Sequence, residues 1–178
     1  MPLSEGWRDQ YNRMLRSRAR LAEAAGPSSI GSDEARDRLY HFFQDAFHLR
    51  DWLRYSDDPT ITAKAAALWG AGSHIKATPV LALCHDICIG VKHFRVDRPA
   101  TGDAATTISS QSVTLNVAVL SAQAYIDSGK AERGAPAELT TAIHVWEISS
   151  DGQVYDAVQL ADDVIAAWNG WLRANGML

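Results

Sequence analysis

The strongest constraint on the fold is the spacing of apolar residues between positions 33 and 55. On a helical wheel they occupy one arc of about 120 degrees, the width of a core-facing surface. These residues are Leu39, Phe42, Phe43, Ala46, Leu49 and Leu53. The spacing predicts a long amphipathic helix that packs against other helices.

Further helices are predicted on the same grounds. Residues 4–25 form an amphipathic pattern closed by Gly26 and Pro27, and residues 156–175 form another that ends at Gly176. A short helix with Thr60 as its N-cap is expected, and a second long one from Pro79 to about Phe94. The core arc of this second long helix consists of Val80, Leu83, Cys84, Ile87, Val91 and Phe94.

The pattern changes from helical to alternating at Ser112. The stretch "SVTLNVAVL" places Val113, Leu115, Val117 and Val119 on one face of a strand, and "ELTTAIHVWEIS" supplies a partner. The Asp-Gly pair in "SSDGQVYD" is a hairpin signal. The predicted fold class is therefore α+β. It is a predominantly helical bundle (4–95) with a small antiparallel hairpin or meander (112–155) before the C-terminal helix (156–175).

Bulk properties limit the class of protein. A chain of 178 residues with 47% hydrophobic and 21% charged content is expected to be one globular domain, residues 1–178. Its net charge of -4 argues against binding nucleic acid through bulk charge. The absence of a signal peptide and of a long apolar run predicts a cytoplasmic protein without a membrane partner. The cysteines, Cys84 and Cys88, are expected to be reduced and in the core.

Two helices carry polar residues beside their predicted core arcs. The first polar stripe, in residues 33–55, contains His41, Asp45, His48 and Trp52, which are neighbours because side chains three and four apart share a helix face. The second polar stripe, in residues 79–94, contains Asp86, Gly90 and His93. Because both stripes lie at about the same angle from the core, we expect them to face one another across a shared cleft.

His48 is the strongest candidate, since Asp45 and Asp51 lie three residues away on either side and each can hold one imidazole tautomer. Arg36 and Lys92 lie near the two stripes. If this site is functional, His48→Ala is expected to abolish activity at little cost in stability. The alternative is that these histidines are structural and are satisfied by neighbouring carboxylates.

Residues 36–41, "RDRLYH", resemble the R-x4-6-H motif of HEPN-type helical proteins, and "GVKHF", residues 90–94, resembles a Lys-His pair of some HEPN-like families. The resemblance covers residues 4–95 and implies a metal-independent ribonuclease or RNA-binding protein of toxin or phage-defence systems, without a cofactor. It implies that Arg36 binds phosphate and that His41 is the general acid or base. It also favours a homodimer that joins two arginine-rich first helices in one groove.

Two other functions remain open. Asp45, His48, Asp86 and His93 form the donor set with which helical bundles hold iron, manganese or zinc, which predicts a metalloenzyme. Alternatively, a polar cleft walled by Trp52, Tyr55 and Trp69 binds a small nucleotide-like ligand without catalysis.

Overall fold

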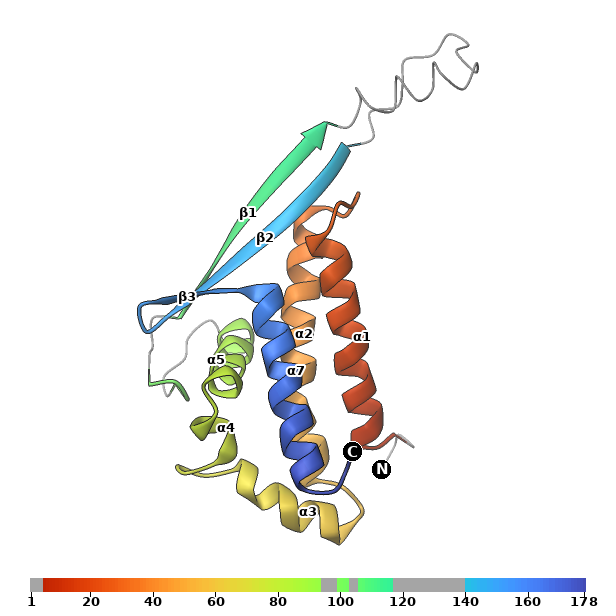
Figure 1. Ribbon diagram of the computed structural model, residues 1–178, viewed down its shortest axis with the longest axis vertical. Coiled ribbons are helices and arrows are strands. Elements are labelled where there is room, and N and C mark those ends of the chain that lie inside the picture. Colours follow the sequence, from red (N-terminus) through yellow and green to blue (C-terminus); the bar gives the residue numbers. More distant parts are fainter. Residues whose placement is uncertain (1–4, 94–98, 103–105, 117–139) are drawn as a thin grey trace.

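The computed structural model describes residues 5–93, 99–102, 106–116 and 140–178; the side chains of His93, 110–116 and 140–142 are outside the description. Three long helices lie side by side (Figure 1): α1 (Trp7–Ala25), α2 (Ser32–Arg54) and α7 (Ala157–Ala174). The fifth helix, α5 (Pro79–His93), packs against both α2 and α7. The predicted helical bundle is confirmed.

The connection from α2 to α5 is made of short helical pieces. It contains α3 (Pro59–Ala65), the 3-10 helix η1 (Ala66–Leu68) and α4 (His74–Ala77). The helix cap differs from the sequence-based expectation at α3. Asp58, rather than Thr60, is the N-cap, because its carboxylate accepts the Thr60 backbone N–H at 2.8 Å while Pro59 occupies the first turn.

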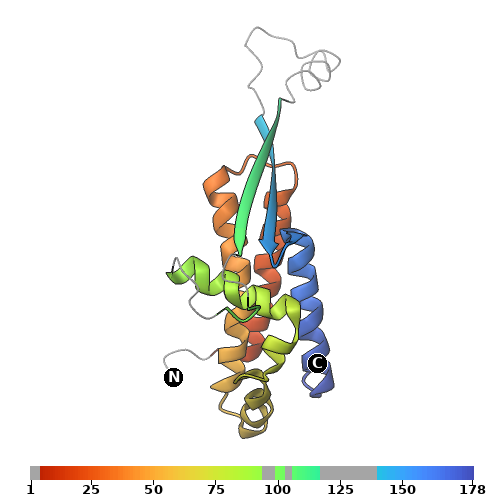
Figure 2. The same cartoon turned by 90° about the vertical axis from the view of Figure 1, so that its left-hand side faces the viewer.

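The sheet has three antiparallel strands in the order β1 (Thr107–Asn116), β2 (Thr140–Ser150) and β3 (Gln153–Asp156). The β1–β2 hairpin continues beyond one end of the helices (Figure 2). The Asp-Gly turn is confirmed: Asp151 and Gly152, which join β2 to β3, have φ of 50° and 71°. The sheet thus precedes α7, as predicted.

The start of the β segment was predicted too late. β1 begins at Thr107, five residues before Ser112, and Ser110 pairs with Trp146 of β2. The Gly, Asp and Ser residues of "TGDAATTISS" favour turns, so the sequence predicted a loop there, but residues 107–110 pair with β2 and belong to the sheet. Val113 and Leu115 lie two apart in β1, as predicted for one face. Val117 and Val119 are outside the described residues.

The core joins the helices to the sheet. All six residues of the predicted α2 arc have no exposed surface, and Trp146 and Ile148 of β2 are buried with them. Phe47 is also buried, although it lies outside the predicted arc. The two cysteines are free and buried, as predicted, and burial raises the pKa of Cys88 to about 11. None of the described helices is long and apolar enough to cross a membrane.

Candidate functional site

Asp45, the central carboxylate of the first polar stripe, faces α1. Its Oδ2 accepts the Ser17 hydroxyl at 2.5 Å, and Gln10 Nε2 donates to its backbone carbonyl at 2.8 Å. Both donors are buried, with 3% and 1% of their surface exposed. Buried polar groups need such partners. The geometry therefore makes Asp45 part of the contact between α1 and α2.

The two histidines of the first polar stripe are at the surface. His41 and His48 are exposed, and His48 Nδ1 lies 3.3 Å from Asp51 Oδ2, which is the i,i+3 contact expected from the sequence. Arg36 is exposed and pairs with Asp33 at 2.6 Å. His41, His48 and Arg36 are accessible, but they do not line either of the two cavities described below, whereas Asp51 and Trp52 line the second one.

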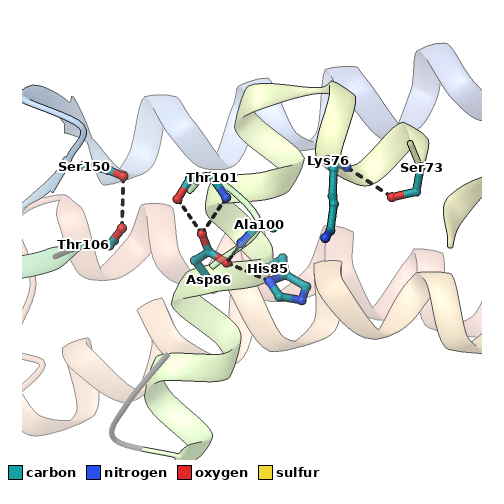
Figure 3. A network of polar contacts seen from close by, with 8 residues as sticks. All are labelled: Ser73, Lys76, His85, Asp86, Ala100, Thr101, Thr106 and Ser150. Atoms are coloured by element: carbon teal, nitrogen blue, oxygen red, sulfur yellow. Dashed lines mark hydrogen bonds and ion pairs between the residues drawn. The ribbon is translucent and has the colours of Figure 1, made fainter. Parts of the chain in front are cut away.

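Asp86, the carboxylate of the second polar stripe, is fully buried and faces the segment after α5. Its oxygens accept hydrogen bonds from the backbone N–H of Ala100 at 2.6 Å, from the backbone N–H of Thr101 at 2.9 Å and from the Thr101 hydroxyl at 2.6 Å (Figure 3). Burial raises the pKa of Asp86, but the hydrogen bonds from His85, Thr101 and Ala100 outweigh it and leave the pKa below its ordinary value. Asp86 is therefore a fixed anion.

His85 is held by this carboxylate. Its Nδ1 lies 2.8 Å from Asp86 Oδ1 (Figure 3), and its ring meets Phe47 edge-on with centroids 5.1 Å apart. Because ionised Asp86 only accepts, Nδ1 carries the hydrogen and donates it, which leaves Nε2 as the acceptor of the neutral ring. Among the described residues nothing hydrogen-bonds to Nε2.

His85 lines a cavity of about 370 Å³, called the His85 cavity below. Its walls come from α2, from the link through η1 and α4, from α5 and from the segment after α5. The lining residues are Arg50, Leu68, Trp69, Gly70, Ala71, Ser73, Ile75, Lys76, His85 and Ala100. Lys76 is exposed at the rim, and Ser73 caps α4 through the Lys76 N–H (Figure 3). The cavity thus combines two cationic side chains with an oriented imidazole.

Arg50 is the most constrained side chain of the His85 cavity. Only 16% of it is exposed, and its guanidinium carbon lies 3.8 Å from the centre of the Phe47 ring and 4.2 Å from that of Trp69. Burial lowers the pKa of Arg50, and neighbouring Asp51 opposes this. Asp51 Oδ1 is 3.4 Å from Arg50 Nε but lacks hydrogen-bond geometry, so the buried Nε has no hydrogen-bond partner among the described residues. The Nε–H of Arg50 is therefore an unsatisfied donor.

The two carboxylates of the stripes bond to different elements. Asp45 is bonded to α1 and Asp86 to the segment after α5, and neither lines one of the two cavities, so a cleft shared by the stripes stays a prediction. Lys92 is exposed on α5, and the side chain of His93 lies outside the described residues. Across the described part of the chain, no three His, Cys, Asp or Glu side chains are grouped to hold a metal ion.

The predicted aromatic wall is divided between two cavities. Trp69 lines the His85 cavity, whereas Trp52 and Tyr55 line a second one near the start of α1. Sequence reasoning passed over His85 because it fell on the outer arc of its helix, and passed over Arg50 because charged residues on amphipathic helices are usually solvated. The adjacent pair His85-Asp86 was the available signal.

Comparison of the chain with models of known protein families, with curated proteins and with solved structures finds no match. The resemblance to HEPN-type proteins stays a prediction.

Proposed function

We propose that the protein binds a phosphate-bearing ligand, a nucleotide or an RNA, in the His85 cavity. One observation carries the proposal: the largely buried Arg50 guanidinium lines the cavity, and its buried Nε has no hydrogen-bond partner among the described residues although Asp51 Oδ1 lies 3.4 Å away. A buried cation is costly unless an anion and hydrogen-bond acceptors compensate it. Phosphate supplies both, since its oxygens match the planar guanidinium fork.

The neighbouring groups support the same ligand class. Lys76 adds a second positive charge at the rim, and Asp86, which remains an anion, is hydrogen-bonded to Ala100 and Thr101 and is not among the residues that line the cavity. A volume of about 370 Å³ is within the range of small-ligand sites, which is roughly 300 to 1,000 Å³. Such a cavity accommodates a nucleotide or the end of an RNA strand rather than a duplex.

A second candidate function is cleavage of the bound RNA, and the orientation of His85 favours it. A histidine whose Nδ1–H is held by a carboxylate while Nε2 remains unbonded has the arrangement of a general base. In this form of the proposal His85 and Arg50 replace His41 and Arg36. The latter pair has less support, because both side chains are exposed and Arg36 is paired with Asp33. The homodimer and the link to phage defence or toxin systems remain part of the proposal.

The test is isothermal titration with inorganic phosphate, adenosine monophosphate and a short single-stranded RNA. Arg50→Gln is expected to weaken binding of all three at least about tenfold, the usual effect of losing a charge-assisted hydrogen bond. Arg54→Gln is the matched control: Arg54 lies one turn further along α2 and also stacks on Trp69 at 4.2 Å, but it does not line the cavity. Its affinities should stay within about twofold of the unmodified protein.

Arg50→Lys separates binding from folding, because it keeps the charge but loses the two-pronged contact. It should fold normally and still bind phosphate weakly. Equal losses in the Arg50 and Arg54 variants, or no phosphate binding by the unmodified protein, would overturn the proposal. Incubation of a labelled RNA with the unmodified protein and His85→Ala distinguishes cleavage from retention.

A further inference from the structure

The His85 cavity contains a hydrogen-bond acceptor as well as cationic donors, and this restricts its ligand further than charge does. Arg50 and Lys76 supply only N–H donors, because neither side chain can accept a hydrogen bond. His85 differs from them: its Nδ1–H is held by Asp86 Oδ1 at 2.8 Å, so Nε2 of the neutral ring carries a lone pair. Within the part of the chain that the structure describes, no donor is bonded to this nitrogen.

The orientation of this imidazole is fixed on two sides. Asp86 also accepts hydrogen bonds from Ala100 and Thr101, which hold the carboxylate in place. The His85 ring meets Phe47 edge-on with centroids 5.1 Å apart, and only 17% of the His85 side chain is exposed. Because Nδ1 is turned toward Asp86, Nε2 points away from the carboxylate (Figure 3).

Arg50 and His85 approach the same aromatic ring. The guanidinium carbon of Arg50 lies 3.8 Å from the centre of the Phe47 ring, and the centre of the His85 ring lies 5.1 Å from it. Arg50 and His85 both line the cavity, whereas Phe47 does not. A ligand that meets Arg50 with an anionic oxygen and carries a hydroxyl group beside it therefore has the size to reach His85 Nε2 as well.

A lone pair in such a site discriminates between anions of equal charge. Hydrogen phosphate has one O–H group to donate, whereas sulfate has only acceptors. Sulfate would place an oxygen against a nitrogen that also accepts, and both would lack a hydrogen-bond partner, which costs free energy. The same contrast holds for a ribonucleotide, whose 2′-hydroxyl lies next to the 3′-phosphate, and its deoxy counterpart.

We propose that His85 determines the specificity of the cavity: Nε2 accepts a hydrogen bond from a hydroxyl group that the ligand carries next to its phosphate oxygens. This inference rests on the proposed function, since it names the class of phosphate ligand that the cavity selects. The hydroxyl group belongs either to hydrogen phosphate itself or to the ribose of a ribonucleotide. An anion without a hydroxyl group is bound only through the cationic side chains.

Two pairs of ligands test the proposal by isothermal titration of the full chain at about pH 8, where phosphate groups are dianions. Inorganic phosphate is compared with sulfate, and adenosine 3′-monophosphate with 2′-deoxyadenosine 3′-monophosphate. The member with the additional hydroxyl group is expected to bind at least about tenfold more tightly, the usual effect of one hydrogen bond to a charged group. A difference in the first pair alone identifies free phosphate as the source of the hydroxyl group, and a difference in the second identifies the ribose.

Two variants remove the acceptor. His85→Ala should reduce the difference within a pair to less than about twofold, by weakening the ligand with the hydroxyl group and not its partner. His85→Phe keeps a ring against Phe47 and tests the same point if the alanine variant does not fold. Arg50→Gln should weaken both members of each pair, because both need the cation.

His48→Ala is the matched control. His48 also has its Nδ1 near a carboxylate, 3.3 Å from Asp51 Oδ2, and its ring near Phe47, with centroids 5.6 Å apart, but it does not line the cavity. The difference within each pair should persist in this variant. The inference is overturned if neither pair shows a difference, or if the difference survives in the His85 variants. Equal binding of phosphate and sulfate that Arg50→Gln weakens leaves the proposed function standing, whereas no binding of any phosphate ligand removes both.

Discussion

Asp45 on α2 and Asp86 on α5 occupy similar positions beside the core arcs of their helices, yet their surroundings differ. Asp45 meets two polar side chains of α1, Gln10 and Ser17, and its carboxylate joins two helices. Asp86 meets backbone N–H groups after α5 and orients His85 beside a cavity. The role of a polar residue at the edge of a helix core face therefore depends on the element that packs against it.

The largest expected effect in this comparison is on stability at Asp86. Asp86→Ala removes a buried carboxylate that accepts hydrogen bonds from the half-buried Ala100 and Thr101 and from His85, so we expect the free energy of unfolding to fall by about 3 kcal/mol. Urea denaturation measures this. Asp37→Ala, an exposed position on α2, should change it by less than about 0.5 kcal/mol. A small effect at Asp86 would mean that these contacts contribute little to folding.

The pH dependence of the unfolding free energy tests whether Asp86 has a lowered pKa in the folded protein. The pKa of Asp86 is lower in the folded state than its ordinary value of 3.8, so its contribution to stability is present above that value and is lost as the pH falls through the folded pKa. Asp86→Asn does not titrate. The stability difference between the unmodified protein and this variant should therefore be constant from neutral pH down to about pH 5 and narrow below about pH 4. A difference that does not change with pH contradicts the depressed pKa.

A smaller effect is expected at the contact between α1 and α2. Ser17→Ala removes the donor to Asp45 Oδ2, and we expect a loss of about 1 kcal/mol in unfolding free energy. Phosphate affinity should not change, because neither residue lines the His85 cavity. Denaturation and titration of the same sample test both statements. If Ser17→Ala loses phosphate binding but keeps its stability, Asp45 belongs to the binding site after all.

The smallest effect is expected at His48. Its side chain is 46% exposed, so His48→Ala should change stability by less than about 0.5 kcal/mol and leave phosphate affinity unchanged. His85→Ala should weaken phosphate binding in the same titration, since it removes a group that lines the cavity. The reverse ranking would restore His48 as the central residue, as the sequence suggested.

The core face of α2 could be predicted because periodicity is a local property: its six predicted apolar residues, from Leu39 to Leu53, are all buried. On α5 the prediction was less complete, because Val80 and Val91 are only half-buried while Leu81 and Cys88, outside the predicted arc, are buried. The burial of Phe47 was not predicted, because it depends on contacts with His85 of α5 and with Arg50, which covers its ring. The early start of β1 was not predicted, because Ser110 belongs to the strand through its pairing with Trp146 of β2, which is more than 30 residues away in the sequence.

The candidate site was predictable only in part. The sequence indicated Asp86 as a polar residue beside a core arc and Trp69 as a cavity wall, and both lie at or next to the His85 cavity. It did not indicate that Arg50, Lys76 and Ala100, which are up to 50 positions apart, border the same space. No spacing rule relates residues on separate elements.

The helices, the late antiparallel sheet and the Asp151-Gly152 turn could be predicted from the sequence, because hydrophobic period and backbone preference act within a few residues. Which boundary residues are structural and which face a cavity depends instead on how the elements pack. That choice depends on whether a neighbouring element supplies hydrogen-bond partners, as α1 does for Asp45, or leaves donors unused, as for Arg50. A buried polar group is stabilised by what is packed against it, and that neighbour can come from any part of the chain.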